Sequence, residues 1–139
     1  MPRSRRNPPA GYIYHVLNRA NRRQTLFECT SDFEAMIAVV LETCLLHPLR
    51  ILDYCLMPNH WHFVMWPCED DQLAAFMHHL TTTHATRWNR AHRVSGTGHV
   101  YRGPYYDAFV SVLDETWLRV PLLPAPDRPA RLSAGRFCW

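Results

Sequence analysis

Two histidines one residue apart, His60 and His62, are the side chains of this sequence best suited to chemistry. They lie in the stretch MPNHWHF, residues 57–63, directly after a Pro-Asn pair in a segment that otherwise has the composition of a buried strand. Side chains at positions i and i+2 of a strand share one face, so both imidazoles are predicted to point the same way. Two neutral imidazoles on one face can bind a single divalent cation.

Two alternatives compete with this metal site. A His-x-His pair is a weak motif by itself, and two hydrogen-bonded surface histidines account for it equally well. A zinc site that adds Cys55 and Cys68 is the second alternative, although the spacing of these four residues matches no closed zinc knuckle. On the next predicted helix, His78, His79 and His84 form no i, i+4 pair, which predicts solvated side chains rather than a second metal site.

The distribution of arginine indicates a polyanionic partner. The formal net charge is only +3, and none of the fifteen strongly basic residues is a lysine. Six arginines precede the first acidic residue, Glu28; they are Arg3, Arg5, Arg6, Arg19, Arg22 and Arg23. A positive field without compensating acids favours nucleic acid as the partner. A solvated basic tail explains Arg3 to Arg6 equally well, but it fits residues 18–23 less well because they adjoin a predicted strand.

A second segment, residues 101–106, interleaves aromatic and basic side chains. Tyr101, Arg102, Tyr105 and Tyr106 have the pattern of a stacking platform for unpaired bases. Adjacent residues of a strand face opposite sides, so the core is predicted to bury one of Tyr105 and Tyr106.

The elements that must position these residues alternate between strand and helix. Strand composition covers residues 11–19, 49–57, 60–66 and 105–112, and Pro58 with Asn59 supplies a hairpin turn. A first helix is predicted to begin at Thr30 or Ser31 and to end near Pro48, and a second helix covers residues 69–93. The apolar stripe of the first helix is predicted to comprise Phe33, Met36, Ile37, Val40, Leu41, Cys44 and Leu45.

The order strand, helix, strand, strand, helix, strand predicts an α+β fold of the ferredoxin-like kind. In that sandwich, one antiparallel sheet carries two helices on one face and leaves the other face open for a ligand. A chain of 139 residues is long enough for one compact domain without disulfides. Its five cysteines are odd in number and include no C-x-x-C pair, which predicts reduced thiols. No apolar run approaches the ~20 residues of a membrane span, so a cytoplasmic protein is expected.

Three stretches together are more specific than any single motif. They are YHVLNRANRR at residues 14–23, DYCLMPNHWHFVMWP at 53–67 and GHVYRGPYYDAFV at 98–110. Over residues 11–119 the chain resembles the REP-associated tyrosine transposases, single-tyrosine members of the HUH endonuclease superfamily. The resemblance implies a ferredoxin-like fold that binds single-stranded or hairpin DNA, and it matches His60 and His62 to the ligand pair for Mg²⁺ or Mn²⁺. A monomer or homodimer is expected.

The chemistry that this resemblance implies is metal-dependent DNA cleavage and strand transfer. The metal polarises a phosphate, and a tyrosine oxygen attacks it, displaces a 3′ hydroxyl and forms a 5′-phosphotyrosine bond. The 3′ hydroxyl of another strand can later attack this bond, release the tyrosine and rejoin the DNA. The residues expected to contact DNA are Asn18, Arg19, Arg22, Arg23, Tyr101 and Arg102. Two other functional classes remain as alternatives: a non-catalytic module that binds single-stranded or hairpin DNA, and a hydrolase that uses a metal-bound water.

The last part of the chain departs from the family pattern. The family's nucleophilic tyrosine lies on a helix after the last strand, but prolines at 121, 124, 126 and 129 are incompatible with a helix interior. No tyrosine follows Tyr106 in these 139 residues, which leaves Tyr106 and Tyr105 as fallback nucleophiles. We therefore expect a basic tail at 1–10, a transposase domain at 11–119, a Pro/Ala/Arg-rich tail at 120–139 and no catalysis. A frameshift near Val120 is the hypothesis that accounts for this tail.

Overall fold

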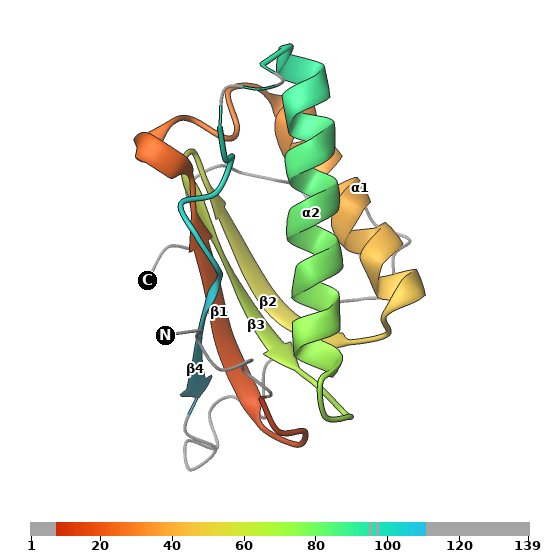
Figure 1. The fold of residues 1–139 in the computed structure, drawn as a ribbon. Coiled ribbons are helices and arrows are strands. Elements are labelled where there is room, and N and C mark those ends of the chain that lie inside the picture. Colours follow the sequence, from red (N-terminus) through yellow and green to blue (C-terminus); the bar gives the residue numbers. More distant parts are fainter. Residues whose placement is uncertain (1–7, 95, 97, 111–139) are drawn as a thin grey trace.

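The computed structural model describes residues 8–94, 96 and 98–110, which form one four-stranded sheet with two helices on one face (Figure 1). The elements are β1 (Ile13–Arg19), the 3-10 turn η1 (Asn21–Arg23), α1 (Thr30–Leu46), β2 (Arg50–Met57), β3 (His60–Trp66), α2 (Gln72–His92) and β4 (Tyr106–Val110). The strand order is β2-β3-β1-β4, and every neighbouring pair is antiparallel. The predicted α+β, ferredoxin-like architecture is confirmed.

Local backbone conformation accounts for most differences between the predicted and observed ends of the elements. Strand β1 begins at Ile13 and not at residue 11, because Gly11 has a φ of 82° and belongs to a turn. Helix α2 begins at Gln72 and not at residue 69, because its N-cap, Asp71, has a left-handed φ of 63°. The predicted strand at 105–112 is observed over Tyr106–Val110, and residues 111 and 112 lie outside the described residues.

Alternation along the central strands separates a core face from an open face. On β3, Trp61, Phe63 and Met65 are fully buried under the helices, whereas the residues between them are only partly buried. Strand β1 alternates in the same way, with Tyr14 and Val16 in the core. The two strands pair in register from Tyr14–Met65 to Arg19–His60. Residues directly opposite each other point to the same face of a sheet, so the side chains that alternate with the core residues of β1 and β3 lie together on the open face.

The face of α1 that packs on the sheet differs from the predicted stripe. Leu41 and Leu45 were expected in the core, but their side chains are 46% and 84% exposed. Val39 and Thr43 are buried instead, and the Thr43 hydroxyl donates to the Val39 carbonyl at 2.6 Å, which satisfies it inside the core. Because apolar residues occur on nearly every side of α1, their spacing alone cannot select the packed side.

A buried polar chain links the sheet to α2. The Trp61 indole donates to the Tyr101 hydroxyl at 3.1 Å, and that hydroxyl lies 2.5 Å from Nδ1 of His84. Since the Tyr101 oxygen already accepts a hydrogen bond, its own proton is available to Nδ1 of His84. His84 is therefore a core residue, and the prediction that it is solvated is wrong. Burial lowers the pKa of His84 to about 4 and raises the pKa of Tyr101.

His84 should make the fold sensitive to acid. Its folded pKa of about 4 lies below the ordinary 6.5, so the unfolded chain binds the proton first and stability falls as the pH drops through this window. The loss attributable to His84 at pH 4.5 is about 2 to 3 kcal/mol. His84→Gln, which keeps an acceptor but does not titrate, should lose less stability between pH 7 and 4.5 in urea unfolding.

The matched control for this experiment is His78→Gln, because His78 is exposed on the same helix. Its stability should depend on pH as the parent protein's does. An equal loss of stability in the parent and in His84→Gln would show that His84 is not the group that titrates.

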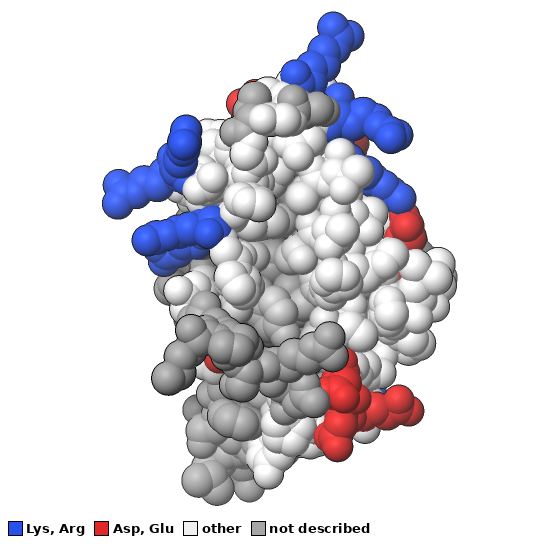
Figure 2. Space-filling view, viewed as in Figure 1, with Lys and Arg blue, Asp and Glu red and all other residues white. Residues whose placement is uncertain are grey.

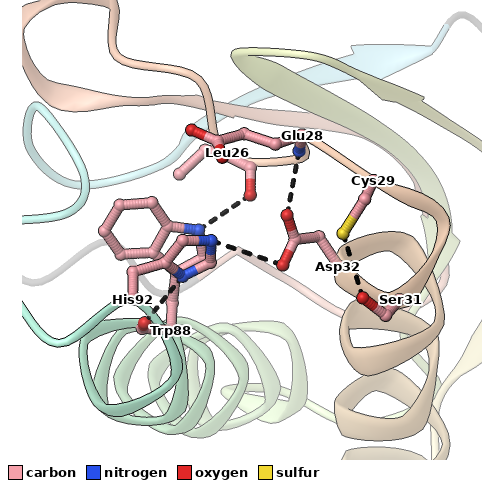
Figure 3. Close-up of polar contacts among 7 residues, drawn as sticks. All are labelled: Leu26, Glu28, Cys29, Ser31, Asp32, Trp88 and His92. Carbon is pink, nitrogen blue, oxygen red and sulfur yellow. Dashed lines mark hydrogen bonds and ion pairs between the residues drawn. The ribbon is translucent and has the colours of Figure 1, made fainter.

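Polar contacts join α1, α2 and the segment between η1 and α1 (Figure 3). The Trp88 indole donates to the Leu26 carbonyl at 2.7 Å, and Nε2 of His92 lies 3.4 Å from Oδ1 of Asp32. The other oxygen of Asp32 accepts from the backbone amide of Glu28 at 2.9 Å. These contacts hold residues 26–28 in place between the two helices.

The segment that these contacts hold supports the turn before His60. The backbone amides of Leu26 and Phe27 both donate to the Pro58 carbonyl, at 2.7 and 3.2 Å. On the other side, the amide of Ala20 donates to the Asn59 carbonyl at 2.9 Å. The hairpin turn is thus fixed from two directions, which positions the first histidine of the pair.

Candidate metal and nucleic-acid site

Three histidines gather on the open face of the sheet. His60 and His62 come from β3, and their ring centroids lie 5.0 Å apart with the planes at 81°. His15 joins them from β1: its ring lies nearly parallel to that of His62, at an interplanar angle of 7°, with 5.1 Å between the two ring centroids. Sequence reasoning missed His15, although it lies in the YHVLNR stretch of the family resemblance. Strand alternation could have placed it on the open face, but only the pairing of β1 with β3 brings it to His62.

Each histidine of the pair is held through Nδ1. Nδ1 of His60 lies 2.7 Å from Oδ1 of Asn59, an atom that can only accept, so Nδ1 carries the proton. Nδ1 of His62 lies 2.9 Å from Nε2 of His15. Within the described residues, no hydrogen bond engages Nε2 of either ring, which leaves that nitrogen available to a ligand.

The electrostatics keep this pair neutral. The pKa of His60 is lowered, mainly by burial and to a smaller extent by the positive charge of Arg19. Burial also lowers the pKa of His62 to about 4, with His15, His60 and Arg19 adding to the effect. A neutral imidazole is the form that binds a metal ion.

The donor set fits two ligands of a divalent cation. Two neutral imidazoles with free Nε2 atoms are suitable donors, and Mg²⁺-type sites use few protein ligands together with water and substrate phosphate. In the part of the chain that the structure describes, no group of three His, Cys, Asp or Glu side chains could hold a metal by itself. The alternative closed zinc site with Cys55 and Cys68 therefore has no counterpart among these residues.

A cavity of about 450 Å³ opens beside His60. Its lining consists of His60, Asn59, Ala20, Asn21 and four arginines, Arg19, Arg22, Arg23 and Arg102. The backbone joins the distant segments here, since the amide of Arg102 donates to the Arg19 carbonyl at 3.0 Å. Figure 2 shows basic side chains on the side of the molecule that carries η1 and a second basic group at the upper right, over the end of α2, while acidic side chains gather at the lower end, near the start of α2. Four of the six predicted DNA-contacting residues thus line one cavity.

The other two predicted contacts lie in the interior. Asn18 is buried; its amide nitrogen donates to the Gly103 carbonyl at 3.3 Å, and its Oδ1 accepts from the Arg19 amide at 2.8 Å. Tyr101 is buried, with its hydroxyl bonded to Trp61 and His84. The prediction that Tyr101 stacks on bases does not fit this burial. Each of the two is the sequence neighbour of an arginine that lines the cavity, Arg19 or Arg102.

The backbone at η1 is strained. Arg22 and Arg23 have φ values of 52° and 56°, a left-handed conformation that costs an L-residue about 1 to 2 kcal/mol. Asparagine or glycine would be the ordinary residues at such positions. Strain retained at two adjacent arginines that line a cavity is consistent with a functional use of their side chains.

The two fallback tyrosines, Tyr105 just before β4 and Tyr106 at its start, differ in burial as predicted. Tyr105 packs against the core, whereas Tyr106 is 59% exposed. Tyr106 pairs with Leu17, and Leu17 in turn pairs with His62, so Tyr106 shares the open face with the histidines. Tyr106 and His62 are two strand spacings apart, so the distance between their Cα atoms is about 9.5 Å.

Comparison with known proteins identifies the family. The profile of the family described as "Transposase IS200 like" matches residues 10–116. The chain belongs to this transposase family. No curated protein matches its sequence significantly.

Two solved structures share the fold of this transposase-family chain. One is a REP-associated tyrosine transposase bound to a REP hairpin, with 16% identity and a TM-score of 0.61 over 86% of this chain and 68% of the other. The second, from Deinococcus radiodurans R1 and assigned as a transposase, has 12% identity and a TM-score of 0.54 over 86% of this chain and 92% of the other. Among the described residues, no helix combines the length and the apolar character needed to cross a bilayer.

Proposed function

We propose that this member of the transposase family binds single-stranded DNA beside a hairpin and holds a phosphate next to a divalent cation at His60 and His62. The observation that carries the proposal is the arginine-lined cavity, because His60 is part of its wall. Four guanidinium groups in one cavity suit the phosphates of a nucleic acid backbone. The hairpin found with the REP-associated tyrosine transposase supports the choice of DNA.

The residues of the chain have separate tasks in this proposal. Arg19, Arg22, Arg23 and Arg102 bind phosphates in the cavity, and the exposed ring of Tyr106 offers a stacking surface to a base on the open face. His60 and His62 would hold Mg²⁺ or Mn²⁺, which when bound would polarise a phosphate oxygen.

The domain boundaries and the loss of catalysis also belong to the proposal. The transposase domain covers residues 11–119, with a basic tail at 1–10 and a Pro/Ala/Arg-rich tail at 120–139 that arose by frameshift. The non-catalytic DNA-binding module is the second candidate, and the observation that favours it is the run of prolines from residue 121, where the family carries its nucleophile. Residues 1–7 and 111–139 lie outside the described residues. A cytoplasmic monomer or homodimer remains part of the proposal.

The test is binding of a labelled single strand that carries a hairpin, compared with a blunt duplex, over a range of salt concentrations. With four arginines on phosphates, log K should fall with log salt at a slope of about −3, and the hairpin strand should bind more tightly than the duplex. Arg22→Gly should weaken binding about tenfold and make the slope shallower by about 0.7. It should not destabilise the fold, because glycine accepts the left-handed backbone at this position.

Arg87→Gly is the matched control. Arg87 lies in the C-terminal half of α2 and pairs with Glu42 at 2.8 Å, and it is not among the residues that line the cavity. Glycine there should cost about 1 kcal/mol of stability and leave DNA affinity unchanged. Equal affinity for the blunt duplex, or an Arg22→Gly variant that binds hairpin DNA as the parent does, would contradict the proposal.

A further inference from the structure

We propose that His15 is a positioning residue for the metal pair: it accepts a hydrogen bond from Nδ1 of His62 and thereby directs Nε2 of His62 to the cation. This inference rests on the proposed role of His62 as a ligand. His15 lies on β1, outside the His-x-His motif, and its contact with His62 is created by the pairing of β1 with β3.

The hydrogen bond between the two rings allows two arrangements of protons. In one, Nδ1 of His62 donates to Nε2 of His15, and Nε2 of His62 keeps its lone pair. In the other, Nε2 of His15 donates, and the proton of His62 then occupies Nε2, where it prevents metal binding. Only the first arrangement leaves His62 able to bind a cation through the nitrogen that no described residue engages.

The geometry supports a specific contact. The two ring nitrogens are 2.9 Å apart, and the rings are nearly parallel, at 7°, so His15 restrains both the protonated atom and the plane of the His62 ring. His60 has an equivalent arrangement, because Oδ1 of Asn59 takes its Nδ1 proton at 2.7 Å. Both histidines of the pair therefore have an acceptor at Nδ1, which is how proteins commonly orient metal-binding histidines.

Two substitutions at position 15 distinguish the role of His15 as a hydrogen-bond acceptor from its role in packing. His15→Gln places an amide oxygen close to the former position of Nε2, so it can still accept from His62. His15→Leu fills similar space but cannot accept. We expect Mn²⁺ affinity, measured by calorimetry without DNA, to fall 10- to 100-fold in His15→Leu and to recover to within about threefold of the parent in His15→Gln.

A second measurement determines directly which ring nitrogen of His62 carries the proton. Nitrogen NMR of the imidazoles with Mg²⁺ bound should show the His62 proton on Nδ1 in the parent and in His15→Gln. Stability in urea should be the same in all three proteins, because His15 is not part of the core.

The possible results distinguish this inference from the proposed function. If His62→Ala binds Mn²⁺ as tightly as the parent, the proposed metal pair itself is wrong. If His62→Ala loses binding but His15→Leu keeps it, only the role of His15 is overturned. Equal losses in His15→Leu and His15→Gln, or a His62 proton on Nε2 with Mg²⁺ bound, would also overturn that role.

Discussion

His62→Ala is expected to weaken Mn²⁺ binding by at least about 100-fold in calorimetry, and His60→Ala should do the same. Loss of a contact behind a metal ligand already costs about 10- to 100-fold, so loss of the ligand itself should cost no less. The expectation depends on three observations: both rings are on the open face, both pKa values are lowered, and no described residue engages either Nε2.

The control for this experiment is His78→Ala. His78 is exposed on α2, which covers the opposite face of the sheet, so its removal should leave Mn²⁺ affinity unchanged. Identical affinities in the parent, His60→Ala and His62→Ala would contradict the assignment and favour two hydrogen-bonded surface histidines.

The second large effect is the absence of a covalent product. We expect the polypeptide of 139 residues to form no phosphotyrosine adduct with hairpin-bearing single-stranded DNA, even with Mn²⁺, on a denaturing gel. The family resemblance implies a nucleophile on a helix after the last strand, and the prolines at 121 and 124 are incompatible with a helix interior. Tyr106 shares the open face with His62, but Tyr106 is on β4 and His62 is on β3, with β1 between them. A misplacement of ~1 Å from in-line geometry can cost about 100-fold in rate.

Variants of the two tyrosines test this expectation. A shifted band that is present in the parent and in Tyr105→Phe but absent in Tyr106→Phe would show that Tyr106 is a nucleophile, and would contradict the proposed inactivity. A band that appears only when the alternative reading frame is fused after Val120 would support the frameshift. DNA that is cut without a shifted band would instead indicate a hydrolase that uses a metal-bound water.

The sequence was sufficient to predict features that depend on local pattern. The β2–β3 hairpin was predicted because Pro58 and Asn59 separate two strand-like runs, and the shared face of His60 and His62 follows from the two-residue period of any strand. The family resemblance rested on three linear stretches, and the matching family profile confirmed it.

Predictions failed where several packings were compatible with one local pattern. Helix α1 is apolar on nearly every side, so its spacing did not reveal that Val39 and Thr43, and not Leu41 and Leu45, face the sheet. Tyr101 had the pattern of an exposed stacking residue, yet it lies in the core because Trp61 and His84 supply partners for its hydroxyl. Burial of such polar groups depends on partners that are distant in sequence.

Sequence alone therefore predicted the fold class, the family and the shared strand face of His60 and His62, because each follows from local patterns along the chain. Only the tertiary structure brought His15 to His62, across 47 positions, and gathered Arg19, Arg22, Arg23 and Arg102 around His60. Those contacts are set by the strand order β2-β3-β1-β4 and by the register of β1 against β3. A register shift of one residue would move His15 to the core face, so its contact with His62 exists only in the assembled sheet.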